Sequence, residues 1–419
     1  MSRIAVLHPQ CSRVWWAIQM ALQTVHALQK QGHTVTLYTF EKSDACFPDL
    51  QTWINIEKWH KKIGGKLISI ITLAFHLRHF DIIIANNPPM QIVAALAKLF
   101  SQNNVRTLWW HHHIPWYLSP KNKIKSFMER HFIVPKIDQM IATSHFVSEK
   151  IQEYCGRESV VVHPVIQEIQ NTGEMPKGMS SNKRQNDELL LSSNEWNRLN
   201  QLNALNNVTL FTHGRLEAGK GIDVLTRVFD KIKNSDKAPL SRGDAWKAEG
   251  FNTWKTNPPI ENWITPPLDR GASQINLIIF WTGSLETKLR EEGIDVRLFR
   301  GQETFQTLSS WQFGHVIGVY CSSIDAFGMA SLESQMAGFP TIIMDRGGAR
   351  EAILSDDDDH PVGYLVHTEE ELFRTISRYV QQKTFPKQLS NVNFSHKRDY
   401  FSPTRLSSDL LSLMSKTRL

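Results

Sequence analysis

The chain has 419 residues, of which 41% are hydrophobic and 21% are charged. This length fits two or three domains, and the composition allows a core of normal size without disulfide or metal staples. The net charge of +6 is uneven, because residues 1–167 hold 18 Lys and Arg against 10 Asp and Glu. This basic half favours an anionic partner such as a phosphate-bearing substrate, a membrane surface or a nucleic acid, although a solvated basic surface would give the same count.

The cysteines and the N-terminal segment indicate in which cellular compartment the protein is expected. The four cysteines are far apart and form no CxxC pair, so the sequence indicates neither a zinc site nor a disulfide framework. The chain starts with a strand-like run instead of a signal peptide, and no stretch of about 18 uncharged apolar residues occurs. We therefore expect a soluble, cytoplasmic protein without a membrane-spanning helix.

The first 167 residues alternate between strand and helix patterns. Residues 3–8 (RIAVLH) form an apolar run typical of a buried parallel strand. A helical pattern over residues 14–31 ends before Gly32, and residues 33–40 predict a second strand. The same rhythm predicts further strands at 81–85, 105–110, 138–143 and 159–162, with helices at 90–100 and 145–154.

The composition changes near Gln167. Residues 168–206 are polar and predict a linker or insertion, and a second polar insertion covers about 234–274. Between and beyond them, strands are predicted at 207–212, 275–281, 296–299, 316–320, 341–344 and 364–366, and an amphipathic helix at 404–414. The pattern predicts an α/β fold with two Rossmann-like, doubly wound sheets, whose ligands would bind in a central cleft beyond the carboxyl ends of the strands.

A loop with two cations follows the first strand of the second domain. It reads HGRLEAGKGID over residues 213–223, with Arg215 and Lys220 five residues apart where a helix begins. Backbone N–H groups and the helix dipole favour anions there, so the loop suits a diphosphate. It is nearly a P-loop, but Gly221 replaces the Ser or Thr that would bind Mg²⁺. The structural alternative is a Gly-rich helix start with solvated cations.

Two carboxylates follow the strand at 316–320. The segment SSIDAFGMASLE places Asp325 in a loop and Glu333 in the next helix, so both can face the carboxyl edge of the sheet. Carboxylates accept hydrogen bonds from vicinal hydroxyls, and residues 327–329 offer N–H donors near a helix N-terminus. A solvated helix cap at Asp325 and a surface glutamate at Glu333 would give the same spacing.

A third loop follows the strand at 341–344 and reads DRGGARE over residues 345–351. Its two glycines would allow the backbone to approach a ligand closely, or they would simply form a tight turn between strand and helix.

The order and context of these loops resemble the retaining family-four glycosyltransferases of the GT-B fold. That family carries G-R-x-x-x-x-K-G, then E-G-F-G-x-x-x-x-E, then G-G-x-x-E; this chain has GRLEAGKG, DAFGMASLE and GGARE. The N-terminal half matches family segments in FDIIIANNPP, LWWHHHIPWY, IDQMIATSHFVSEKI and VVHPV. The resemblance covers most of the chain apart from the two polar insertions, and it implies two Rossmann-like domains facing a central cleft.

The resemblance also implies a domain plan and an activity. Residues 1–167 would bind the acceptor, residues 207–385 would bind the donor, and residues 386–419 would cross back to the first domain. The implied reaction moves a hexose from a nucleotide-diphosphate sugar to a glycan or lipid-linked acceptor with retention, without a cofactor or metal. The opening HPQCSRVWWAIQ resembles mannosyltransferases that act on lipid-linked glycans, which favours mannose.

Carried over residue by residue, the resemblance implies that Arg215 and Lys220 hold the diphosphate and that Asp325 lies near the donor sugar. Glu333 would accept hydrogen bonds from the ribose hydroxyls. His113, in HIP, matches a histidine near the reacting sugar, with His111 and His112 as adjacent competitors for that role. The implied catalytic set is Arg215, Lys220, Asp325 and His113, and the donor-binding set is Gly214, Phe327, Gly328, Met329, Glu333, Gly283 and Arg300.

Two departures from the family pattern leave a second function open. Asp325 is one methylene shorter than the family glutamate, and the Gly-Gly loop after the first strand is missing. A degenerate protein that binds a nucleotide or glycan without turnover would fit both. Binding of nucleic acid is disfavoured, because the tryptophans follow strand and helix patterns instead of lying among basic residues.

A basic region precedes the apolar run at 67–77, and Lys121, Lys123 and Lys125 form a second basic cluster. An interfacial helix on anionic lipid would have this pattern, and so would an ordinary helix with solvated lysines. The sequence thus leaves a peripheral contact with the cytoplasmic face of a membrane as an expectation. The three consecutive histidines do not predict a metal site, because residues along a strand point to alternate faces.

Overall fold

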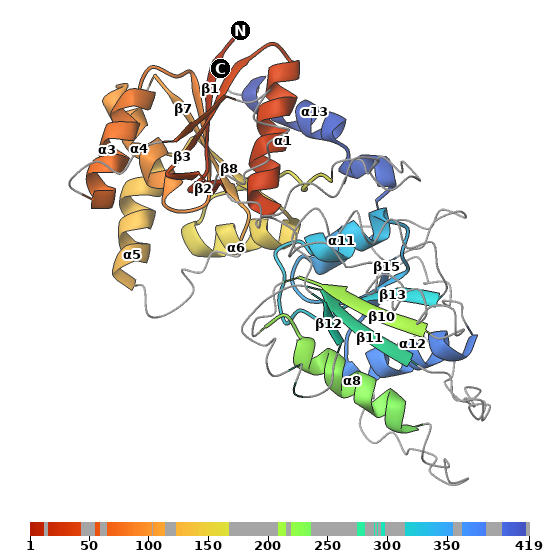
Figure 1. The fold of residues 1–419 in the computed structure, drawn as a ribbon. Coiled ribbons are helices and arrows are strands. Elements are labelled where there is room, and N and C mark those ends of the chain that lie inside the picture. Colours follow the sequence, from red (N-terminus) through yellow and green to blue (C-terminus); the bar gives the residue numbers. More distant parts are fainter. Residues whose placement is uncertain are drawn as a thin grey trace, which may run out of the picture.

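The computed structural model describes residues 1–11, 16–42, 55–58, 65–102, 104–113, 123–166, 208–214, 219–235, 275–280, 289, 291, 295–297, 315–354, 363–382 and 396–415. Two domains, each built on a parallel sheet, are stacked along the long axis of the molecule (Figure 1). The predicted linker at 168–206 lies outside the described residues, as does almost all of the second polar insertion.

The N-terminal sheet has seven parallel strands in the order β5-β3-β1-β6-β7-β8-β9. The order doubles back at β1, which pairs with β3 on one side and β6 on the other. A small parallel pair, β2 (Gln10–Cys11) and β4 (Glu41–Lys42), lies beside it. The strands are β1 (Arg3–Leu7), β3 (Thr34–Thr39), β5 (Asn55–Lys58), β6 (Ile82–Asn86), β7 (Arg106–His111), β8 (Gln139–Ala142) and β9 (Ser159–Val161).

Helices cover both faces of this sheet, because β1, β6 and β7 carry apolar side chains on both sides. Helix α1 (Trp16–Lys30) turns Ile18, Leu22 and Val25 onto one face and stops before Gly32, whose φ of 81° suits a helix end. The other face is covered by α3 (Gly65–Leu77), α4 (Met90–Phe100) and α6 (His145–Cys155), with α5 (Lys123–Met128) running on into the π-helical turn η3 (Glu129–Ile133) and the 3-10 turn η4 (Val134–Lys136).

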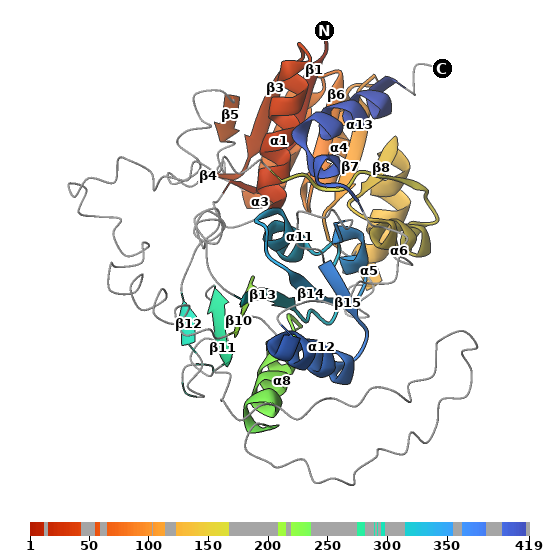
Figure 2. The same ribbon diagram turned by 90° about the vertical axis from the view of Figure 1, so that its right-hand side faces the viewer.

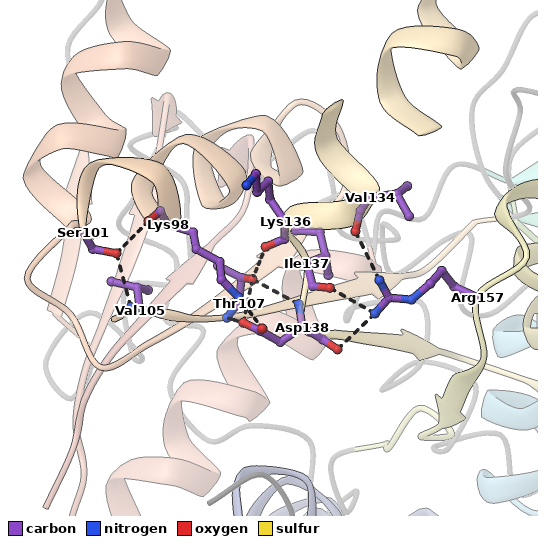
Figure 3. A network of polar contacts seen from close by, with 9 residues as sticks. All are labelled: Lys98, Ser101, Val105, Thr107, Val134, Lys136, Ile137, Asp138 and Arg157. Carbon is purple, nitrogen blue, oxygen red and sulfur yellow. Dashed lines mark hydrogen bonds and ion pairs between the residues drawn. The ribbon is translucent and has the colours of Figure 1, made fainter. Parts of the chain in front are cut away.

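A polar network holds the amino ends of β7 and β8 (Figure 3). The Asp138 carboxylate accepts hydrogen bonds from the backbone N–H of Thr107 at 2.8 Å and from its hydroxyl at 3.1 Å, and it pairs with Lys98. The Arg157 guanidinium donates to the carbonyls of Ile137 and Asp138 at 3.1 and 3.2 Å. The network satisfies backbone groups where the two strands begin.

The C-terminal sheet has six parallel strands in the order β12-β11-β10-β13-β14-β15, and β10 lies at the reversal between β11 and β13. Its strands are β10 (Val208–His213), β11 (Ile275–Phe280), β12 (Asp295–Arg297), β13 (His315–Tyr320), β14 (Thr341–Met344) and β15 (Gly363–Val366). Helices α8 (Ile222–Ser235) and α12 (Glu369–Gln382) cover one face, and α11 (Met329–Met336) lies toward the N-terminal domain (Figure 2).

The last helix, α13 (Pro403–Ser415), lies against α1 of the N-terminal domain (Figures 1 and 2). Its residues Leu406, Leu410 and Leu413 are buried in the same core as Ile18 and Val25. Two stretches of chain therefore cross between the domains. They meet where the N–H of Ile166 donates to the carbonyl of Phe401 at 3.0 Å, next to the 3-10 turn η8 (Arg398–Phe401).

Candidate active site

The loop after β10 lies directly on the end of β13. Gly221 has a φ of 69°, and a Cβ there would lie 1.8 Å from the carbonyl oxygen of Cys321, so only glycine fits. The carbonyl of Gly219 accepts the N–H of Ser323 at 2.8 Å and its hydroxyl at 3.0 Å. The backbone thus joins the first two of the three predicted loops at the carboxyl edge of the sheet.

Lys220 and Asp325 form an ion pair across these two loops. The Lys220 Nζ lies 3.4 and 3.5 Å from the two carboxylate oxygens of Asp325, and the side chains are 31% and 25% exposed. Because both remain partly accessible, the pair can exchange its mutual contact for contacts with a ligand. An ammonium and a carboxylate side by side suit a ligand that carries both phosphate and hydroxyl groups.

Glu333, on α11, reaches back to the end of β10. Its Oε2 accepts a hydrogen bond from Nε2 of His213, the last residue of β10, at 2.9 Å. The His213 side chain is only 5% exposed, whereas that of Glu333 is 31% exposed. The Glu333 carboxylate is therefore held by the buried His213 ring and remains partly accessible to solvent.

The third loop packs on the second through two glycines. Gly347 pairs with Asp325 in an isolated parallel bridge, and the N–H of Gly348 donates to the Asp325 carbonyl at 2.8 Å. A Cβ on Gly347 would lie 2.4 Å from that carbonyl oxygen, and one on Gly348 would lie 2.2 Å from the carbonyl oxygen of Ala326. The absence of a side chain at Gly347 and Gly348 therefore allows the two loops to pack closely. Nearby, Arg350 is paired with Asp345, which agrees with a structural role for this arginine.

The start of α11 carries the predicted N–H donors. Gly328 precedes the helix with a φ of 91°, and the Phe327 side chain is buried with Ile166 and Phe401 at the crossing between the domains. The first N–H groups of an α-helix have no acceptor within the helix, so those of Met329 and its neighbours offer an anion-binding end. The buried Phe327 ring fixes where this helix begins.

The histidines lie at the carboxyl edge of the N-terminal sheet. His112 Nε2 lies 2.7 Å from Oδ1 of Asn86, and Asn87 Nδ2 lies 3.3 Å from Nε2 of His8. Burial first, and the neighbouring His113 second, lower the pKa of His111 to about 3; burial likewise lowers that of His112 well below its ordinary value. His111 and His112 are thus held neutral inside the edge, while the half-buried His113 lies at its surface.

The comparisons with known proteins agree with this architecture. Residues 19–167 match the family model described as Glycosyltransferase Family 4. HepE of Anabaena, solved with UDP and glucose, is 15% identical, with a TM-score of 0.63 over 99% of this chain and 100% of its own. A glycosyltransferase of Rickettsia africae is 13% identical, with a TM-score of 0.62 over 99% of both chains. No protein of curated function matches the sequence.

WaaG, a glycosyltransferase involved in lipopolysaccharide biosynthesis, is also similar, with 13% identity and a TM-score of 0.57 over 99% of this chain and 100% of its own. The chain therefore has the GT-B fold of these glycosyltransferases, and its residues 19–167 match the Family 4 model. The predicted α/β fold with two Rossmann-like domains is confirmed. Within the described ranges, none of its helices has the length and hydropathy needed to cross a bilayer.

Glu351 is a residue whose importance between the domains the sequence did not indicate. It is 2% exposed, and its carboxylate accepts hydrogen bonds from the N–H groups of His145 and Phe146 at 2.7 and 3.1 Å, at the start of α6 in the other domain. It also contacts Nε2 of His163 at 2.9 Å. The GGARE motif includes Glu351, but it does not indicate the partners of this residue. These partners lie 188 to 206 positions away in the sequence and belong to the other domain.

The structure brings together most of the predicted donor-site residues. Lys220, Asp325, Glu333 and Gly328 lie on loops or elements that contact one another at the carboxyl edge of the C-terminal sheet. Gly214 follows β10 with a φ of 138°, and His113 lies in the other domain. Three predicted site residues lie outside the described residues, namely Arg215, Gly283 and Arg300.

Proposed function

We propose that this protein is a glycosyltransferase that moves a hexosyl group from a nucleotide-diphosphate sugar to a glycan or lipid-linked acceptor, with retention of anomeric configuration. The observation that carries the proposal is the contact of the Lys220 ammonium with Asp325, on a loop whose neighbouring helix holds Glu333 against the end of β10. One edge of the C-terminal sheet therefore offers a cation for phosphate and two carboxylates for hydroxyl groups.

In this proposal Lys220, with Arg215, binds the diphosphate and stabilises it as it leaves. Asp325 accepts hydrogen bonds from the donor sugar, Glu333 accepts them from the ribose hydroxyls, and the N–H groups that begin α11 contact the sugar and phosphate. Charge grows on the diphosphate as the bond to the anomeric carbon breaks, so a fixed cation beside it lowers the barrier.

The transfer uses the leaving group as the base. The bond between the anomeric carbon and the diphosphate oxygen breaks, the acceptor oxygen bonds to the same face of that carbon, and the acceptor proton passes to the departing phosphate. His113, at the edge of the facing sheet, contacts the reacting sugar. The proposal includes no metal or other cofactor, because two side-chain cations supply the charge that a metal would otherwise provide.

Two observations bear on the donor. HepE, which has the same fold, is solved with UDP and with UDP-glucose. The opening segment of the present chain instead resembles mannosyltransferases, and mannose is the hexose that we propose. A screen of thermal unfolding with UDP-glucose, UDP-galactose, GDP-mannose and ADP-glucose identifies the donor, and proton NMR of the product gives its anomeric configuration. Formation of the other anomer would contradict retention.

We further propose that the N-terminal domain contacts an anionic membrane, which would present a lipid-linked acceptor. Helices α3, α4 and α5 lie together on the side of the domain away from α1 and α13 (Figure 1). Among the residues that the structure describes, ten of the thirteen exposed large apolar side chains lie on these helices and on η3: Leu67, Ile68, Ile71, Phe75, Leu99, Phe100, Ile124, Phe127, Met128 and Phe132. We call these ten residues the apolar face.

The charges around the apolar face favour anionic lipid. Residues 65–80 contain no Asp or Glu, and the only acid among residues 121–136 is Glu129. That carboxylate is buried and accepts a hydrogen bond from Gln91 at 3.1 Å, so it is turned away from solvent. Exposed Lys123 and Arg130 remain beside Ile124 and Phe132. Apolar side chains bordered by cations are typical of peripheral binding to anionic bilayers.

A catalytically degenerate protein that binds a nucleotide or glycan is the alternative, because Asp325 is shorter than the family glutamate. Release of nucleoside diphosphate separates the two functions. A chain that binds a nucleotide sugar but releases no diphosphate, either to water or to any acceptor supplied, would contradict the transferase proposal and support the binding protein.

A further inference from the structure

A buried chain of hydrogen bonds lies beneath Glu333. Nε2 of His213 contacts Oε2 of Glu333 at 2.9 Å, and Nδ1 of the same ring contacts the hydroxyl of Tyr320 at 2.6 Å. The Tyr320 hydroxyl in turn contacts Oγ of Ser334. His213 ends β10, Tyr320 ends β13, and Glu333 and Ser334 are neighbours on α11, so the chain links three elements below the exposed carboxylate.

The carboxylate of Glu333 determines the direction of the first of these hydrogen bonds. A carboxylate can only accept, so Nε2 of His213 carries the proton that it donates to Glu333. With Nε2 as the donor, Nδ1 can accept the proton of the Tyr320 hydroxyl. Burial raises the pKa of Tyr320 well above its ordinary value, so this hydroxyl keeps its proton. A Tyr320 hydroxyl that donates to Nδ1 favours the tautomer of His213 that donates to Glu333.

Two aromatic rings hold the imidazole in its plane. Phe211 lies nearly parallel to it, at 15° and 6.5 Å between ring centroids, and Tyr320 lies nearly perpendicular, at 87° and 5.4 Å. All three rings are buried, so the donor N–H has a fixed direction. This N–H engages Oε2 of Glu333. Since the Glu333 side chain is partly exposed, Oε1 keeps acceptor capacity for a ligand.

We propose that His213, oriented by Tyr320, is a positioning residue that fixes the Glu333 carboxylate for a vicinal diol, and so makes the donor site selective for ribonucleotides over deoxyribonucleotides. This inference rests on the proposed function, because it takes Glu333 as the acceptor for ribose hydroxyls. A carboxylate already held in one rotamer loses little conformational entropy when it binds two adjacent hydroxyls. A mobile carboxylate loses more entropy on binding and is aligned less well with the two hydroxyls.

The test measures dissociation constants by calorimetry for each nucleoside diphosphate, UDP, GDP and ADP, and for its 2′,3′-dideoxy analogue. The wild-type protein is expected to prefer the ribonucleotide. His213→Leu should weaken binding of the ribonucleotide roughly tenfold and leave the dideoxy analogue almost unchanged, because only the former meets Glu333. His213→Gln, which keeps an N–H donor near the Nε2 position, should restore most of the preference. Tyr320→Phe should lower the preference for the ribonucleotide, as His213→Leu does.

Two results separate the possible failures. If the wild-type protein binds none of the three nucleoside diphosphates, both the proposed function and this inference are overturned. If it prefers ribonucleotides and His213→Leu preserves that ratio, or weakens both ligands equally, only the role of His213 is overturned.

A double-mutant cycle gives the same answer independently of folding. On a Glu333→Gln background, His213→Leu should cause no further loss of ribose preference, since its partner is already removed. An additional loss of the same size as in the wild-type background would contradict the coupling.

Discussion

Glu351 of the C-terminal domain contacts His163 of the N-terminal domain at 2.9 Å, and the two side chains are only 2% and 4% exposed. The same carboxylate accepts hydrogen bonds from two N–H groups at the start of α6. A negative charge at a helix N-terminus is stabilised by the unpaired N–H groups and the helix dipole. One side chain thus performs, for a helix of the other domain, the role that a capping residue usually performs within its own segment.

Glu351→Gln is expected to lower the free energy of unfolding by about 3 kcal/mol, because an amide cannot accept all three hydrogen bonds and leaves buried donors unpaired. Glu149→Gln is the matched control, since Glu149 is exposed on the same helix and its change should stay within about 0.5 kcal/mol. Chemical denaturation of both variants measures the difference. Equal stabilities would show that the contact adds nothing to the association of the domains.

Lys220→Ala is expected to lower kcat by a factor of about 100 or more, because the charge that develops on the diphosphate would lose a fixed partner. Lys231→Ala is the control, since Lys231 of α8 forms an exposed ion pair with Glu370 of α12. Initial rates of nucleoside diphosphate release measure both variants. A kcat that is unchanged in Lys220→Ala would rule out the proposed role of this ammonium.

Gly347→Ala is expected to reduce both stability and activity, because its Cβ would lie 2.4 Å from the Asp325 carbonyl oxygen and would displace that loop. Gly338→Ala separates this clash from backbone strain. Gly338 also has a positive φ, 92°, but a Cβ there meets nothing within 4 Å, so its cost should be about 1 kcal/mol. Thermal unfolding and donor turnover are measured for both. Similar losses in the two variants would assign the effect to φ alone.

The apolar face is tested with lipid vesicles. The protein should sediment with vesicles of phosphatidylglycerol and much less with phosphatidylcholine, and added salt should release part of it. Ile124→Asp with Phe127→Asp should weaken this binding about tenfold or more. Val160→Asp, at an exposed apolar position on β9, which carries none of the ten residues of the apolar face, should bind as the wild type does. Equal sedimentation with both lipids would contradict an electrostatic contribution.

The sequence predicted those parts of the fold that depend on local pattern. Apolar runs and the helical period indicated β1, α1, β3 and the later strands to within a few residues. Strand β5 was not predicted, because it lies in a polar stretch at the sheet edge, and neither was α5, which continues into a π-helical turn. Such elements depend on neighbours that are distant in the chain.

The site was predictable only where residues share a loop motif. Lys220, Asp325 and Glu333 were expected because each follows a strand of one sheet. The contacts of Glu333 with His213 and of Glu351 with His163 span 120 and 188 positions, and they arise from packing between elements or domains. A histidine ending a strand gives no local signal that its ring will orient a carboxylate on a later helix.

The return of α13 to the first domain affects the order in which the protein can fold during synthesis. Leu406, Leu410 and Leu413 complete a core whose other members lie within the first 165 residues. The ribosome must therefore translate the entire C-terminal domain before the core of the first domain can be completed. A nascent chain stalled before residue 403 would expose the surface of α1 that these leucines cover, and it would be a substrate for chaperones until the final helix emerges.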